Sequence, residues 1–127
     1  MGKLAKKILI ACDGNGSGAF IKSLLEKEGY AVSITNSAKE FTDILRNEKY
    51  DLGFINFFMP EMSGREIAEK IRNAKIENTK LILMNVEHFG ARGEEELRKL
   101  GISAYIYGTI YGTGNGHFKK FIKEIIR

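Results

Sequence analysis

Hydrophobic residues along the chain recur with two spacings, which predicts strands and helices in regular succession. Five short apolar runs have the length of buried strands and are bounded by turn residues: Lys7–Cys12, Tyr30–Thr35, Leu52–Asn56, Leu81–Val86 and Ser103–Tyr107. After each run, apolar residues recur every three or four positions, as on one face of a helix. The pattern therefore predicts five strands that alternate with five helices.

Residues with known capping roles mark the ends of several of these helices. Ser37 and Ser63 each stand three residues before a glutamate, which is the spacing of a capping box at a helix start. Gly29 and Gly101 follow helical patterns and provide the left-handed conformation that commonly ends a helix. The fourth helix is expected to be short, covering roughly residues 93–100.

An alternation of strands and helices with right-handed crossovers gives a parallel sheet covered by helices on both faces. We therefore predict an α/β fold of the doubly wound, flavodoxin-like type, with strand order 2-1-3-4-5. In this order the switch point lies between the first and third strands, and ligands bind at the carboxyl ends of such strands. Asp13 and Asn56 end these two strands and are expected to face each other across one crevice.

The composition is that of an ordinary folded domain. The 127 residues, 43% hydrophobic and 28% charged, predict a single domain over residues 1–127 and not a disordered segment. No apolar run approaches the ~20 residues of a membrane span, and no signal-peptide core is visible, so we expect a cytoplasmic location. The single cysteine, Cys12, excludes an internal disulfide and a cysteine-rich zinc site. The net charge of +4 is mild, and we interpret the lysines as solvation and not as a nucleic-acid surface.

Two glycine-rich segments offer a possible ligand site. Gly14, Gly16 and Gly18 precede a helix amino terminus, where free N–H groups attract anions, so this loop could hold a phosphate, a nucleotide or a flavin phosphate. The dinucleotide fingerprint is incomplete, because the second strand ends in Thr35 and not in an acidic residue. The simpler interpretation of this loop, and of Gly112–Gly116, is a flexible connection without a ligand.

Five segments resemble the receiver domains of two-component response regulators. They are Leu9-Ile-Ala-Cys-Asp13, Leu24-Leu-Glu-Lys-Glu-Gly-Tyr30, Tyr50-Asp-Leu52, Met59-Pro-Glu-Met-Ser-Gly64 and Leu100-Gly-Ile-Ser-Ala-Tyr105. The resemblance covers nearly all of the chain. It implies a flavodoxin-like receiver fold and a role in phosphorelay signal transduction.

In this family, an acidic pair follows the first strand and a phosphorylated aspartate ends the third strand. Here the acidic pair falls on Cys12 and Asp13, and the aspartate position falls on Asn56. An amide is not the nucleophile that attacks phosphorus, and magnesium prefers hard oxygen ligands to a thiol. We therefore expect magnesium binding to be weak or absent, with no other cofactor. We interpret Cys12 as a small buried hydrophobic residue and not as a redox switch.

The remaining family positions are also changed. The hydroxyl residue that ends the fourth strand maps onto Asn85, or onto Val86 if no gap is allowed, and the Lys-Pro after the fifth strand maps onto Gly108 and Thr109. Tyr105 matches the aromatic residue that changes rotamer in the family. Without a phosphate and a hydroxyl to draw it inward, we interpret Tyr105 as a packed or surface aromatic.

The resemblance and these departures predict a pseudo-receiver: not an enzyme, but a phosphorylation-independent interaction module in two-component signalling. By resemblance, a histidine kinase, another receiver or an output domain would dock on the face formed by the fourth helix, fifth strand and fifth helix. No direct nucleic-acid or membrane partner is expected. Two alternatives are a residually active phosphoacceptor and a phosphate-, nucleotide- or flavin-binding module that uses Gly14–Gly18. A stand-alone protein and a domain of a larger histidine kinase are both compatible with the sequence.

Overall fold

The computed structural model describes residues 5–12, 17–56, 59, 62–76, 78–86, 95–96, 98–107 and 115–126. The strands are β1 (Lys7–Ala11), β2 (Ala31–Thr35), β3 (Leu52–Asn56), β4 (Lys80–Val86) and β5 (Ile102–Tyr107). The helices with full bounds are α1 (Ser17–Glu26), α2 (Ala38–Asn47), α3 (Gly64–Asn73) and α5 (Asn115–Ile126). Residues 95–96 and 98–99 are also helical, where the sequence predicts the fourth helix, whereas residues 93, 94 and 97 lie outside the described part.

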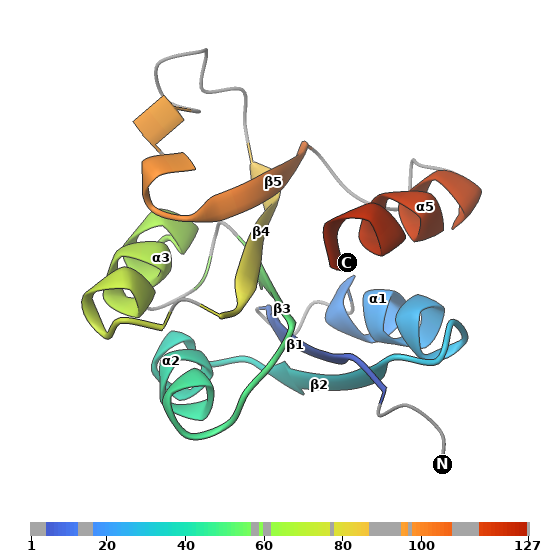
Figure 1. Cartoon of the computed structure of the whole chain (residues 1–127), viewed down its shortest axis with the longest axis horizontal. Helices are drawn as coiled ribbons and strands as arrows, with labels where there is room; N and C mark the ends of the chain where they lie inside the picture. Colours follow the sequence, from blue (N-terminus) through green and yellow to red (C-terminus); the bar gives the residue numbers. More distant parts are fainter. Residues whose placement is uncertain are drawn as a thin grey trace.

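The five strands form one parallel sheet in the order β2-β1-β3-β4-β5, which confirms the predicted order and fold class. In Figure 1, α2 and α3 lie on one side of the sheet, and α1 and α5 lie on the other. Right-handed crossovers between neighbouring parallel strands produce this arrangement. Within the described residues, no helix combines the length and the apolar character needed to cross a membrane.

The core has two halves, one on each face of the sheet. Ile8 and Ile10 pack beneath α1 and α5, whereas Leu9 and Ala11 pack beneath α2 and α3, and all four side chains are fully buried. Every residue of β3 is buried. A central parallel strand is covered on both faces, which explains why apolar runs, and not strict alternation, identify these strands in the sequence.

The predicted loops before α1 and α5 are too long at their ends, since α1 begins at Ser17 and α5 at Asn115, so Gly18 and Gly116 are helical. The predicted starts of α2 and α3 are correct in position, but the two caps differ. At the start of α3, Ser63 accepts a hydrogen bond from the N–H of Glu66, and the Glu66 carboxylate accepts one from the N–H of Ser63, which completes a capping box. At the start of α2, Ser37 accepts from the N–H of Glu40, but its own N–H donates to Thr35 Oγ1 at 3.2 Å. The hydroxyl at the end of β2 thus replaces the glutamate in the second cap.

Three described residues adopt the left-handed conformation. Gly29 (φ 92°) follows α1 and Gly101 (φ 87°) precedes β5, as the sequence predicts. Lys75 (φ 61°) follows α3 and is the only non-glycine residue with a positive φ in the described part of the chain. The N–H groups of Lys75 and Ile76 donate back into the last turn of α3, so this helix ends in a Schellman-type turn.

Candidate functional site

Cys12 and Asn56 lie next to each other at the carboxyl edge of the sheet. The register pairs Ala11 of β1 with Ile55 of β3, so the residues that follow them come side by side. Side chains alternate between the two faces of a strand, which places Cys12 and Asn56 together on the face covered by α1 and α5. Their exposed fractions are 3% and 2%. The structure therefore brings together two of the residues that the sequence selects.

The Cys12 thiol packs directly against the first turn of α1. A Cβ atom added to Gly18 would overlap Sγ of Cys12, so the absence of a side chain at Gly18 has a packing cause. The backbone N–H of Cys12 donates to the carbonyl of Thr35 at 3.1 Å, which continues the pairing of β1 with β2. This environment agrees with the interpretation of Cys12 as a small buried hydrophobic residue.

On β4 and directly after β1, the two strands next to β3, the residues level with Asn56 have sulfur-containing side chains. The register pairs Asn56 with Met84 of β4, which is also 2% exposed, and Cys12 lies on the other side. No buried side-chain nitrogen or oxygen in the described residues lacks a hydrogen-bond partner, so the buried polar atoms of Asn56 are satisfied. A charged carboxylate at this position would lie between a thiol and a thioether, which solvate charge poorly.

The pairing of β4 with β5 is irregular at both ends, between Leu81 and Ile82 and again near the carboxyl edge. Across Asn85 the register advances by two residues in β4 and by one in β5, so Asn85 is the extra residue of a β-bulge. The hydroxyl position of the receiver family maps onto Asn85 or Val86, and the bulge falls at this point. The backbone of Tyr105 belongs to β5, but the side chains of Asn85 and Tyr105 lie outside the described part.

Several predicted site residues lie outside the described residues. These are Asp13, Gly14, Gly16, Gly108 and Thr109. Their roles, and the facing of Asp13 with Asn56, stay predictions.

The described residues of the edge do not fit a magnesium ion. Cys12 offers a buried, soft thiol that is packed under Gly18, and Asn56 offers a neutral amide, whereas magnesium prefers carboxylate and phosphate oxygens. Among the described residues, no three His, Cys, Asp or Glu side chains gather closely enough to hold a metal ion. Because Asp13 is outside that set, the expectation of weak or absent magnesium binding stays a prediction.

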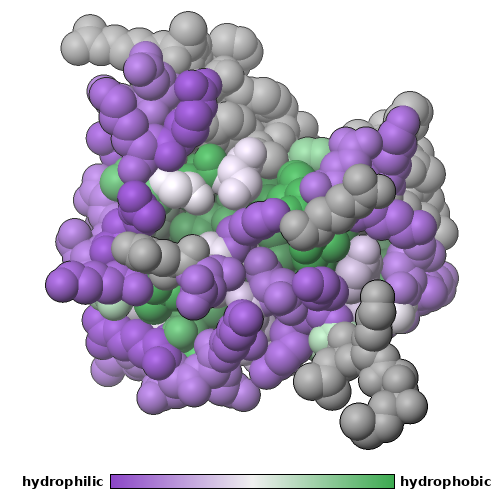
Figure 2. Space-filling model, viewed as in Figure 1, coloured by the Kyte–Doolittle hydropathy of each residue, from purple (hydrophilic) through white to green (hydrophobic). Residues whose placement is uncertain are grey.

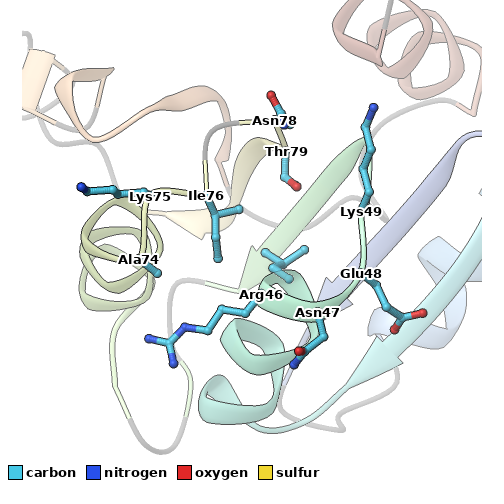
Figure 3. Close-up of a pocket in the computed structure, with 10 residues that line it drawn as sticks. Arg46, Asn47, Glu48, Lys49, Ala74, Lys75, Ile76, Asn78 and Thr79 are labelled. Atoms are coloured by element: carbon cyan, nitrogen blue, oxygen red, sulfur yellow. The ribbon is translucent and has the colours of Figure 1, made fainter.

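A separate hollow lies at the opposite, amino edge of the sheet, a feature that the sequence does not predict. Its volume is about 390 Å³, and it is lined by residues 45–49 at the end of α2 and by residues 74–76, 78 and 79 after α3. Figure 3 shows that the hollow lies between the ends of these two helices. The only sequence signal is a set of lysines and arginines at helix ends, which is also typical of simple solvation.

Comparison with known proteins identifies relatives over most of the chain. Residues 8–109 match the sequence profile of the family described as "Response regulator receiver domain". The "Polar-differentiation response regulator DivK" of Brucella ovis is 29% identical over 104 residues, which cover 81% of this chain and 84% of that protein.

Solved structures agree with these sequence matches. A CheY-like response regulator receiver domain protein from Methanospirillum hungatei superposes with a TM-score of 0.82 at 27% identity, covering 97% of this chain and 94% of that one. The receiver domain of a sensor histidine kinase from Pseudomonas aeruginosa, crystallised with a magnesium ion in its active-site cleft, gives a TM-score of 0.75 at 16% identity, covering 97% and 98%. The second likeness is one of fold alone.

Proposed function

The chain belongs to the response regulator receiver domain family, and from this premise we propose that it acts as a pseudo-receiver in two-component signalling. Its interactions are independent of phosphorylation. The observation that carries the proposal is the pair Cys12 and Asn56, buried side by side at the edge where the family places carboxylates. In this pair the chain has a thiol and an amide, and neither has the chemistry of a carboxylate.

The chemistry of Asn56 supports the absence of phosphotransfer. An amide nitrogen or oxygen at neutral pH is not the activated nucleophile that forms a covalent intermediate. The neighbouring Cys12 and Met84 provide no charge to stabilise a phosphoryl group, and losing one such stabilising group typically costs about 3 kcal/mol in the transition state. Restoring the acceptor alone, in Asn56→Asp, is therefore expected to leave phosphorylation inefficient.

Without a phosphoryl group, nothing at Asn56 can favour one conformation of the domain over another. A ligand or modification shifts a conformational equilibrium only through its differential interaction with the two states. The domain therefore rests in one conformation, and a protein partner acts on it directly.

The partner surface proposed for this role is the face formed by the helical residues near 95–99, β5 and α5. An ion pair connects the first of these elements to α3: the Arg65 guanidinium lies 3.2 Å from the Glu96 carboxylate and 3.4 Å from that of Glu69. Exposed pairs contribute little individually, about 0.2–1 kcal/mol, so this contact orients the segment without locking it. The partners in question are a histidine kinase, another receiver or an output domain.

Amide NMR with magnesium and beryllofluoride, a phosphoryl mimic, tests the proposal. We expect no shifts spread over residues 85–107 in the wild-type chain or in Asn56→Asp, while a receiver with a complete site responds under the same conditions. Titration with a candidate histidine kinase domain is expected to shift the same region without the mimic. Shifts across residues 85–107 caused by the mimic alone would show a working switch and contradict the proposal.

A further inference from the structure

The hollow at the amino edge continues into a second one, and together they form an elongated trough. The second hollow has a volume of about 130 Å³ and shares Ile76 and Thr79 with the first. We call the combined surface the amino-edge trough, which consists of residues 45–49, 72, 74–76, 78–81, 100, 101 and 103. It runs from the end of α2, past the end of α3, to the start of β5.

The described rim of the trough is strongly basic. Its positively charged residues are Arg46, Lys49, Arg72, Lys75 and Lys80. Its only described carboxylate is Glu48, which lies 3.7 Å from the Nζ atom of Lys7, outside the trough. Glu48 is therefore already paired with a residue outside the trough. Two of the cations are also engaged, since Arg46 lies 4.0 Å from the Asp43 carboxylate and Nζ of Lys80 donates to the carbonyl of Ile125 at 2.6 Å. The net positive charge of the described trough thus comes mainly from Lys49, Arg72 and Lys75.

The ends of α2 and α3 account for part of this charge. Helix carboxyl termini attract positive charge, and Arg46 and Arg72 lie in the last turns of α2 and α3. Lys49 and Lys75 follow these helices and lie outside them. In the described part of the chain, neither Lys49 nor Lys75 forms an ion pair. Both ammonium groups are available to an external anion.

The backbone at Lys75 gives a second, independent indication. A left-handed residue at this position after a helix is usually glycine, and a lysine there costs free energy because of its Cβ. Such outliers are common at functional sites, where the surrounding structure holds them in place. A cation kept at a position that favours glycine is consistent with a contact role for Lys75.

The arrangement of the side chains indicates the kind of occupant. In Figure 3 the charged end of Lys49 points away from those of Arg46 and Lys75, so the three groups do not converge on one point as a single phosphate requires. The side chains of Leu45 and Ile76 supply an apolar part of the lining. Figure 2 shows apolar atoms between hydrophilic side chains where α2 and α3 lie. An extended peptide chain can contact separated positive charges on both sides of the apolar side chains of Leu45 and Ile76, whereas a single phosphate cannot.

We propose that the amino-edge trough docks an extended acidic segment of a protein partner, with an apolar side chain seated on Leu45 and Ile76. Lys49 precedes β3 and Asn56 ends it, so the trough and the degenerate phosphoacceptor position lie at opposite edges of the sheet. Docking here needs no change at Asn56. Apart from Ser103, which belongs to β5, the trough consists of residues outside the partner surface of the proposed function. A response to the phosphoryl mimic tests the proposed function, whereas the variants of Lys49 and Lys75 test this inference.

Titration of the isotope-labelled full chain with a short glutamate-rich peptide that carries two central leucines tests this inference. Amide shifts are expected at residues 45–49, 74–79 and 100–103, and not at Cys12 or Asn56. The double variant Lys49→Glu/Lys75→Glu is expected to bind about tenfold more weakly, since two exposed charge contacts become repulsive. The control Lys27→Glu/Lys39→Glu has the same change in net charge at exposed positions outside the trough, and it is expected to retain most of the affinity.

A further variant separates loss of binding from loss of folding. Lys75→Gly removes one charge at a left-handed position that favours glycine, so the fold is retained and a weaker, severalfold loss of affinity is expected. Equal losses in the two double variants, or shifts outside the trough, would overturn the proposal. It also fails if inorganic phosphate reproduces the same shifts at the same concentrations, which indicates a small-anion site. Tighter binding of a short DNA duplex overturns it as well, because the surface then recognises nucleic acid.

Discussion

The Cys12 thiol packs closely against the backbone of Gly18, which has no side chain. The first turn of α1 packs on the thiol at a distance that excludes any Cβ at Gly18. An alanine in a helix is normally more stable than a glycine by about 0.5–1 kcal/mol. At Gly18 the contact of an added Cβ with the sulfur of Cys12 is expected to make alanine less stable than glycine.

Gly18→Ala should therefore destabilise the wild-type chain by about 1–3 kcal/mol, the usual cost of overpacking a filled core. In a Cys12→Ala background the sulfur is gone, and the same substitution should be neutral or slightly stabilising. Urea unfolding of the four chains in this double-mutant cycle measures the coupling. Ser23→Ala, at an exposed position of α1, is the control and should change stability little. An increase in stability when Gly18→Ala is introduced alone would contradict the close packing of Cys12 against Gly18.

The adjacency of Cys12 and Asn56 could be expected from the sequence, but the contact of Cys12 with Gly18 could not. Parallel strands that are neighbours end at the same edge, so residues that end two such strands come together once the strand order is known. The thiol contact depends instead on how closely α1 packs on the sheet. Packing distance is set by all the side chains between helix and sheet, and no single sequence pattern encodes it.

At the scale of elements, the end of α3 stores a small amount of backbone strain in Lys75. Lys75→Gly is expected to raise the free energy of unfolding by about 1 kcal/mol, because the left-handed conformation costs a lysine about that much. Lys70→Gly is the matched control: Lys70 is exposed in the last turn of the same helix, in a helical conformation where glycine costs up to about 1 kcal/mol. Thermal unfolding should move the two variants in opposite directions. A loss of stability in both would contradict the left-handed turn at Lys75.

The elements themselves follow closely from local signals, with two informative exceptions. The capping box at Ser63 forms as its spacing predicts, whereas at Ser37 the hydroxyl of Thr35 takes the place of the glutamate. The bulge at Asn85 is not visible in the sequence. The first exception is a local side-chain contact two residues apart, which competes with the glutamate for the same N–H group. The second depends on the register between β4 and β5, which no local pattern encodes.

For the whole molecule, the strand order follows from the alternation of elements and the right-handed crossover rule, but the amino-edge trough does not. Its lining comes from three separate stretches, around residues 45–49, 72–81 and 100–103, which meet only because β3, β4 and β5 lie in sequence across the sheet. In the sequence, the same lysines and arginines look like ordinary surface solvation. The carboxyl edge with Cys12 and Asn56 and the amino edge with the trough thus lie at opposite ends of the strands.

The central claim, that this receiver does not accept a phosphoryl group, is tested most directly by intact-mass measurement after incubation with acetyl phosphate and magnesium. We expect the mass of the wild-type chain to be unchanged, because Asn56 provides no nucleophile, while a receiver with a complete site gains a phosphoryl group in parallel. A stable gain of one phosphoryl group on the wild-type chain that is absent from Asn56→Ala would contradict the account.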